Sequence, residues 1–173
     1  MTFGSSSKIF QQAMLNPIGR GVAAVTGFPT TYGGLVLDQV KVALFNTTTT
    51  PDNTAAVTST GFNTGVWVTA NEVTDATNWV SGGIVATSNS WAVDTGSSSL
   101  CFHTANTAGT GNVTIANAYG CLVYDNTITA GTVAKQGMCY NSFGGSAQGV
   151  TAGTFTIVWA TVGATTAIFN VTV

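Results

Sequence analysis

The two closest acidic residues in the chain, Glu72 and Asp75, lie in the stretch NEVTDATNWVSGGIVA. Two carboxylates can act as general acid and base when a rigid cleft holds them and their surroundings separate their pKa values. The neighbouring Thr and Asn residues favour a turn instead, because aspartate commonly accepts hydrogen bonds from nearby backbone. A calcium site is a weaker interpretation, since the dense alternation of acids in a calcium loop is missing. We expect a polar turn that leads to Trp79 and the strand that begins at Gly82 and Gly83.

The single histidine of the chain, His103, stands two residues after Cys101 in the segment SSSLCFHTA. Residues two apart on a strand share a face, so a Cys-His pair for nucleophilic catalysis is geometrically possible. No hydrolase signature surrounds either residue, and a hydrogen-bonded histidine on a sheet face is far commoner. We therefore predict no catalytic residue in this chain and no enzyme activity.

The three cysteines, Cys101, Cys121 and Cys139, are odd in number and form no CxxC pair. With a single histidine available, their spacing does not suggest a zinc site. We expect reduced cysteines that pack as small apolar side chains, with a Cys101–Cys121 disulfide as the alternative. The glycine-rich segments GFNTG, GGIV and FGGSAQG match neither phosphate-binding pattern. We predict no metal and no cofactor.

Charged residues make up only 6% of the 173-residue chain, and its net charge is −2. A typical globular protein has about 25% charged residues. Disorder is not expected, because 45% of the residues are hydrophobic and disordered chains combine low hydrophobicity with high net charge. Two surfaces fit this composition: one of small hydroxyl and amide residues, or one covered by copies of the chain or by a partner. We favour the second, an assembly.

The four basic residues, Lys8, Arg20, Lys41 and Lys135, are few and scattered. They cannot neutralise a run of phosphates, so we predict no nucleic-acid partner. No apolar run approaches the roughly 20 residues of a membrane helix, and the first residues lack the pattern of a secretion signal. We expect no membrane association and synthesis in the cytoplasm without export.

The order of the predicted elements indicates an all-β fold. A short helix is expected within SSSKIFQQAMLNP, where serines can cap its start and Asn16-Pro17 can end it. From residue 35 onward, short runs of β-branched and aromatic residues alternate with Gly, Asn and Asp turns. About eight such strands, with no helix between them, predict an antiparallel, jelly-roll-like β-sandwich. Some 20 residues between Phe45 and Val66 show no clear pattern.

We expect a single β-sandwich domain over residues 35–173, preceded by an N-terminal arm over residues 1–34. The arm is broken by glycine and proline and carries isolated apolar residues. These residues are candidate anchors that fill apolar pockets on a partner: Phe3, Ile9, Phe10, Met14, Phe28 and Tyr32. The alternative is an arm that folds back on its own domain.

The order of segments resembles a broad group of structural proteins of tailed bacteriophages. The likeness rests on KIFQQAML, DQVKVALFN, TPDN and NEV followed by GG, and it continues through TIANAYGCLVYDN and GMCYNSFGGSAQGVTAGTFTIVW. The resemblance covers nearly the whole chain and implies a virion protein of the capsid decoration, or cement, type. Such proteins are β-sandwiches that self-associate, often as trimers, and bind the major capsid protein on the outer capsid surface. We therefore expect a homo-oligomer located on the virion.

A second function fits the same composition, namely a lectin-like binding module on a phage tail or head surface. It would hold glycan through aromatic rings in loops, for which Trp67, Trp79 and Trp91 are the candidates. Exposure of these rings beside Asn and Asp would favour glycan binding, whereas burial of all three would exclude it.

Overall fold

The computed structural model describes residues 8–9, 38–94, 99–162 and 165–172. Within these residues the chain forms fourteen β-strands and two short 3-10 helices, η3 (Val57–Ser59) and η4 (Thr69–Asn71). All the strand pairs are antiparallel. The predicted all-β fold is therefore confirmed, while a jelly-roll arrangement stays a prediction.

The largest sheet has the strand order β1-β10-β9-β2-β3, and β4 also pairs with β2. Its strands are β1 (Lys8–Ile9), β2 (Val40–Phe45), β3 (Glu72–Val73), β4 (Ile84–Val85), β9 (Gly120–Asp125) and β10 (Gly137–Ser142). A second sheet has the order β13-β14-β6-β5. Its strands are β5 (Ser90–Asp94), β6 (Ser99–His103), β13 (Ala160–Val162) and β14 (Thr165–Thr172).

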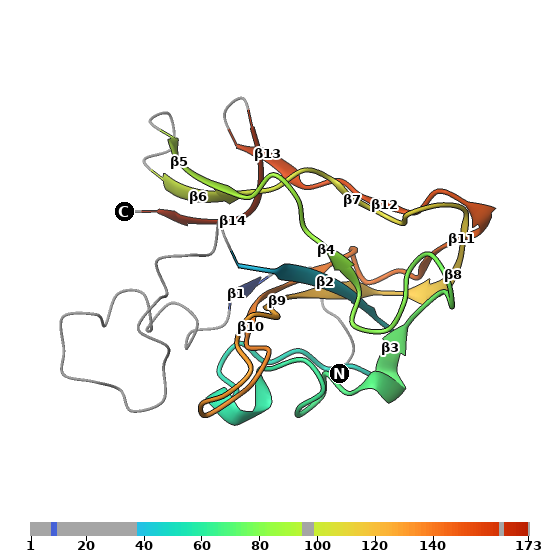
Figure 1. The fold of residues 1–173 in the computed structure, drawn as a ribbon, viewed down its shortest axis with the longest axis horizontal. Coiled ribbons are helices and arrows are strands. Elements are labelled where there is room, and N and C mark those ends of the chain that lie inside the picture. Colours follow the sequence, from blue (N-terminus) through green and yellow to red (C-terminus); the bar gives the residue numbers. More distant parts are fainter. Residues whose placement is uncertain (1–7, 10–37, 95–98, 163–164, 173) are drawn as a thin grey trace.

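Two ribbons of two strands complete the described fold. They pair β8 (Val113–Ala118) with β11 (Gln148–Gly153), and β7 (Thr107–Ala108) with β12 (Thr156–Ile157). In Figure 1 the second sheet and the β7–β12 ribbon lie above the six-stranded sheet, and the loop that contains η3 and η4 lies below it. The central sheet is thus covered from both sides.

Strands β2 and β9 form the centre of the core because both of their faces are buried. One face contributes Val42 and Val123 to a cluster that includes Phe102 and Ile168 of the second sheet. The sequence pattern of β2 suggests one buried and one polar face, but Ala43 on the other face is also fully buried. Burial on both faces explains why β9 is a nearly continuous apolar run.

The second face of the central sheet packs against aromatic residues from the loop over residues 46–71. The ring centroids of Phe45 and Trp67 are 5.1 Å apart in an edge-on arrangement. Those of Phe62 and Tyr124 are 4.9 Å apart and stacked. Two aromatic side chains thus give this loop a defined position, although its sequence shows no strand or helix pattern.

The predicted N-terminal helix is wrong at Lys8 and Ile9. These two residues form β1, in which Lys8 pairs with Tyr140 and Ile9 with Cys139 of β10. A short isolated helix is marginally stable, whereas the edge of β10 offers hydrogen bonds to an extended chain. Ile9 therefore lies on its own sheet, as the alternative of a folded-back arm expects. The remaining anchor candidates lie outside the described residues: Phe3, Phe10, Met14, Phe28 and Tyr32.

Candidate functional site

Asp75 is the centre of a turn, as predicted. Its Oδ1 accepts hydrogen bonds from the backbone N–H groups of Thr77 (3.0 Å) and Asn78 (2.9 Å). Its Oδ2 accepts a third from the N–H of Thr114 in β8 (3.0 Å). These backbone donors, Thr114 first, lower the pKa of the Asp75 carboxyl. The carboxylate therefore holds the turn and attaches it to β8.

Glu72 holds a second turn in the same segment. Its Oε1 accepts a hydrogen bond from the N–H of Gly82 (2.7 Å), and its Oε2 accepts one from the hydroxyl of Ser81 (2.6 Å). Desolvation is the largest influence on this half-buried carboxyl, and it raises the pKa of Glu72. Glu72 and Asp75 thus hold different turns.

The Gly82 turn has a second contact, from a side chain of the central sheet. The Tyr124 hydroxyl donates a hydrogen bond to the carbonyl oxygen of Gly82 (2.7 Å). Burial, followed by the charge of Glu72, raises the pKa of Tyr124. Burial, followed by the charge of Lys135, lowers the pKa of Lys41. The Lys135 ammonium itself lies 5.4 Å from the ring centroid of Phe62. These groups fix the turn onto β2 and β9.

Asp125, at the end of β9, is a buried carboxyl that was not a candidate from the sequence. Its side chain is 3% exposed, and its Oδ1 accepts a hydrogen bond from the N–H of Thr127 (2.8 Å). Burial is the main cause that raises the pKa of Asp125 to about 6, and the neighbouring charge of Asp38 adds to it. The sequence does not indicate that Asp38 and Asp125 are neighbours, because the two residues are far apart along the chain.

The three cysteines are buried thiols, so the predicted packing as small apolar side chains is confirmed and the Cys101–Cys121 disulfide is not formed. Burial raises the pKa of the Cys121 thiol to about 12 and that of Cys139 well above its ordinary value. Thiols in such surroundings are unreactive. His103 is also buried, opposite Ser90 of β5.

No group of three or more His, Cys, Asp and Glu side chains among the described residues could hold a metal ion. In the same part of the chain, no helix has the length and apolar character needed to cross a membrane.

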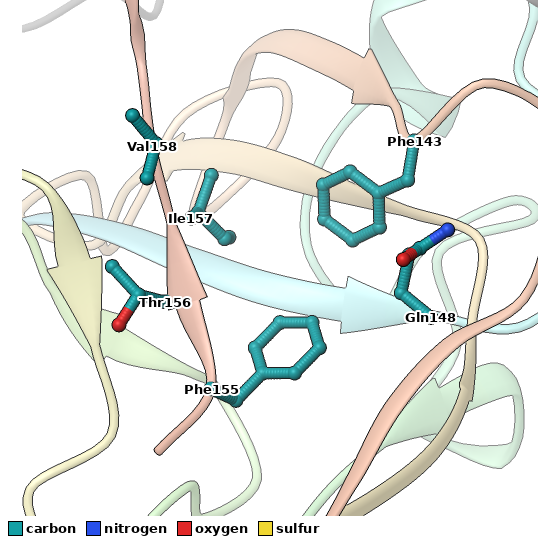
Figure 2. Close-up of a pocket in the computed structure, with 6 residues that line it drawn as sticks. All are labelled: Phe143, Gln148, Phe155, Thr156, Ile157 and Val158. Atoms are coloured by element: carbon teal, nitrogen blue, oxygen red, sulfur yellow. The ribbon is translucent and has the colours of Figure 1, made fainter.

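A largely apolar groove of about 270 Å³ runs beside β12, and the described residues that line it carry no charge. Figure 2 shows the six side chains that form it: Phe143, Gln148, Phe155, Thr156, Ile157 and Val158. The rings of Phe143 and Phe155 are 6.4 Å apart. Val158, at the end of β12, is 71% exposed, while Ile157 is buried. The sequence does not predict this groove, because its lining comes from separate strands: Phe143 follows β10 and Gln148 begins β11.

Two of the three tryptophans proposed for glycan binding are buried. Trp67 and Trp79 are 1% and 0% exposed, so their rings form part of the core. Trp91 lies in β5, but its side chain lies outside the described residues.

No protein-family model, curated protein or solved structure matches this chain.

Proposed function

We propose that the chain is a structural virion protein that binds the outside of a phage capsid and stabilises the shell. In this function it bridges subunits of the major capsid protein and associates with copies of itself, with a trimer as the favoured state. The resemblance in the order of sequence segments supports a phage protein of this type. Binding, without chemistry, is the whole of the proposed mechanism.

The observation that carries the proposal is the exposed aliphatic surface of a chain with little charge. Val158 is 71% exposed, Val80 45% and Val85 40%. Scattered apolar residues are normal on a surface, but here one of them borders an open groove without charged residues. A partner that covers this surface would remove apolar area from water at about 25 cal/mol per Å².

Bridging explains how modest contacts could stabilise a shell. When one contact to a capsid subunit opens, the remaining contacts keep the molecule in place, so rebinding is effectively intramolecular. Each single contact can then be small and weak while the whole array is stable.

The test combines the isolated protein with capsids of the same virus that lack it. We expect a defined oligomer in sedimentation velocity, co-sedimentation with the capsids, and a higher temperature of capsid disruption when the protein is bound. Capsids of an unrelated phage serve as the control. A clean monomer that leaves the disruption temperature unchanged would contradict the proposal, as would an electron-microscopy map of the virion that places the chain on the tail.

A further inference from the structure

Among the residues that the structure describes, strand β12 is paired on one side only. Its neighbour is β7, with Thr156 directly opposite Ala108. The N–H of Gly109 donates a hydrogen bond to the carbonyl oxygen of Phe155 (3.2 Å). Hydrogen-bonded and non-hydrogen-bonded pairs alternate in an antiparallel ladder, so Phe155 and Ile157 direct their backbone groups toward β7.

The backbone groups of Thr156 and Val158 must therefore point to the opposite side of β12. Within the described residues, no backbone hydrogen bond and no further strand engages them there. Both residues are exposed. Each presents one N–H donor and one C=O acceptor, which is the pattern of an open sheet edge.

The apolar groove lies along this same edge. In Figure 2, Phe143 and Gln148 face β12 from across the groove, while Ile157 and Val158 extend from the strand itself. A volume of about 270 Å³ gives room for one or two aliphatic side chains. Without a charged residue in the lining, a charged occupant would lose hydration and gain no partner.

We infer that this edge accepts an extended, uncharged segment of a partner protein, added to β12 as a further strand. The inference rests on the proposed function and identifies the contact through which the chain would hold a neighbouring capsid subunit. Main-chain hydrogen bonds to Thr156 and Val158 supply affinity, and an aliphatic side chain in the groove beside Phe143 supplies specificity.

The occupant is a single extended segment and not the β12 edge of a second copy. In every copy, Phe143 and Gln148 lie beside the open edge of β12. A second copy would bring its own Phe143 and Gln148 to this edge, whereas a lone strand has no such flanking side chains and needs less room.

The test uses short synthetic peptides that alternate threonine with valine, isoleucine, leucine or phenylalanine, observed by amide NMR of the intact protein. We expect at least one peptide to bind at millimolar concentration or below and to shift the amide signals of Thr156 and Val158. Thr156→Pro removes the outward N–H without breaking a bond within the chain, and Val158→Asp places a charge at the groove. Each should weaken binding about tenfold or more.

Thr58→Asp is the control, because it places the same charge on an exposed residue of η3 that does not line the groove, and it should leave peptide binding within about twofold. Circular dichroism and urea unfolding establish that all three variants fold. Equal binding of a peptide whose backbone nitrogens are methylated would overturn the inference, as would the absence of shifts with every peptide.

Capsid binding separates this inference from the proposed function. If Thr156→Pro binds capsids as well as the unaltered protein does, the contact is elsewhere and only the inference fails. If the peptides bind at β12 but the protein ignores capsids, only the proposed function fails. Loss of self-association in Thr156→Pro would identify a second copy as the occupant and would also overturn the inference.

Discussion

Replacing Asp125 by asparagine should change how the stability of the protein depends on pH. Burial raises the pKa of this carboxyl from its ordinary 3.8 to about 6. The folded protein therefore binds a proton more tightly than the unfolded chain does. Stability from this group is fully present below pH 3.8 and is lost as the pH rises through about 6. A shift of this size corresponds to about 3 kcal/mol in the free energy of unfolding.

Asparagine has the same shape, can still accept the hydrogen bond from Thr127, and does not ionise. Urea unfolding followed by tryptophan fluorescence from pH 4 to pH 7 gives the free energy of unfolding of both proteins. We expect the unaltered protein to lose about 2 kcal/mol more than Asp125→Asn over this range, because part of the loss already occurs below pH 4. Titrating groups other than the neighbouring Asp38 are present in the same surroundings in both proteins and largely cancel in the difference.

Asp52→Asn is the control, because Asp52 is exposed and hydrogen bonds from Thr54 lower the pKa of its carboxyl. Its replacement should alter the pH dependence in the opposite sense, since stability from a lowered pKa is lost as the pH falls. Parallel curves for the unaltered protein and Asp125→Asn would refute the argument for a buried, proton-binding carboxyl.

Three further predictions concern the packing of the core. Trp67→Ala should lower the free energy of unfolding by about 3–5 kcal/mol, because the loss of a fully buried ring leaves a cavity. Val80→Ala, on the surface, should change the free energy of unfolding by less than about 0.5 kcal/mol. Urea titrations measure both values. Gly83→Ala should lower the temperature of thermal unfolding more than Gly144→Ala does. Both glycines have a positive φ, but only at Gly83 would a Cβ collide with the carbonyl of Val42. The three cysteines should resist a thiol reagent in the folded protein and react on unfolding; fast labelling of the native state would contradict their burial.

The parts of the fold that depend on local sequence could be predicted. Strand β2 follows from its β-branched alternation, and the Asp75 turn follows from an aspartate among Thr and Asn residues. Lys8 and Ile9 could not be assigned, because helix signals and a free sheet edge compete for the same residues. The edge of β10 is visible only in three dimensions.

The loop over residues 46–71 and the groove show why the rest escaped prediction. Phe62 and Trp67 cover the central sheet as two isolated aromatic residues, which produce no periodic pattern. The groove is lined by Phe143, which directly follows β10, and by Ile157 of β12. Glu72 similarly acts on a turn ten residues further on, through Gly82. Each of these contacts depends on where distant segments meet.

The pairing of β2 with β9 also determines when the protein can fold during its synthesis. Val40 pairs with Asp125, so the ribosome must complete most of the chain before β2 obtains this neighbour. Until then, the edge of this apolar strand that pairs with β9 is available to other nascent chains, and contacts between distant segments form slowly. Production of this protein should therefore respond strongly to temperature and to chaperones that shield nascent strands.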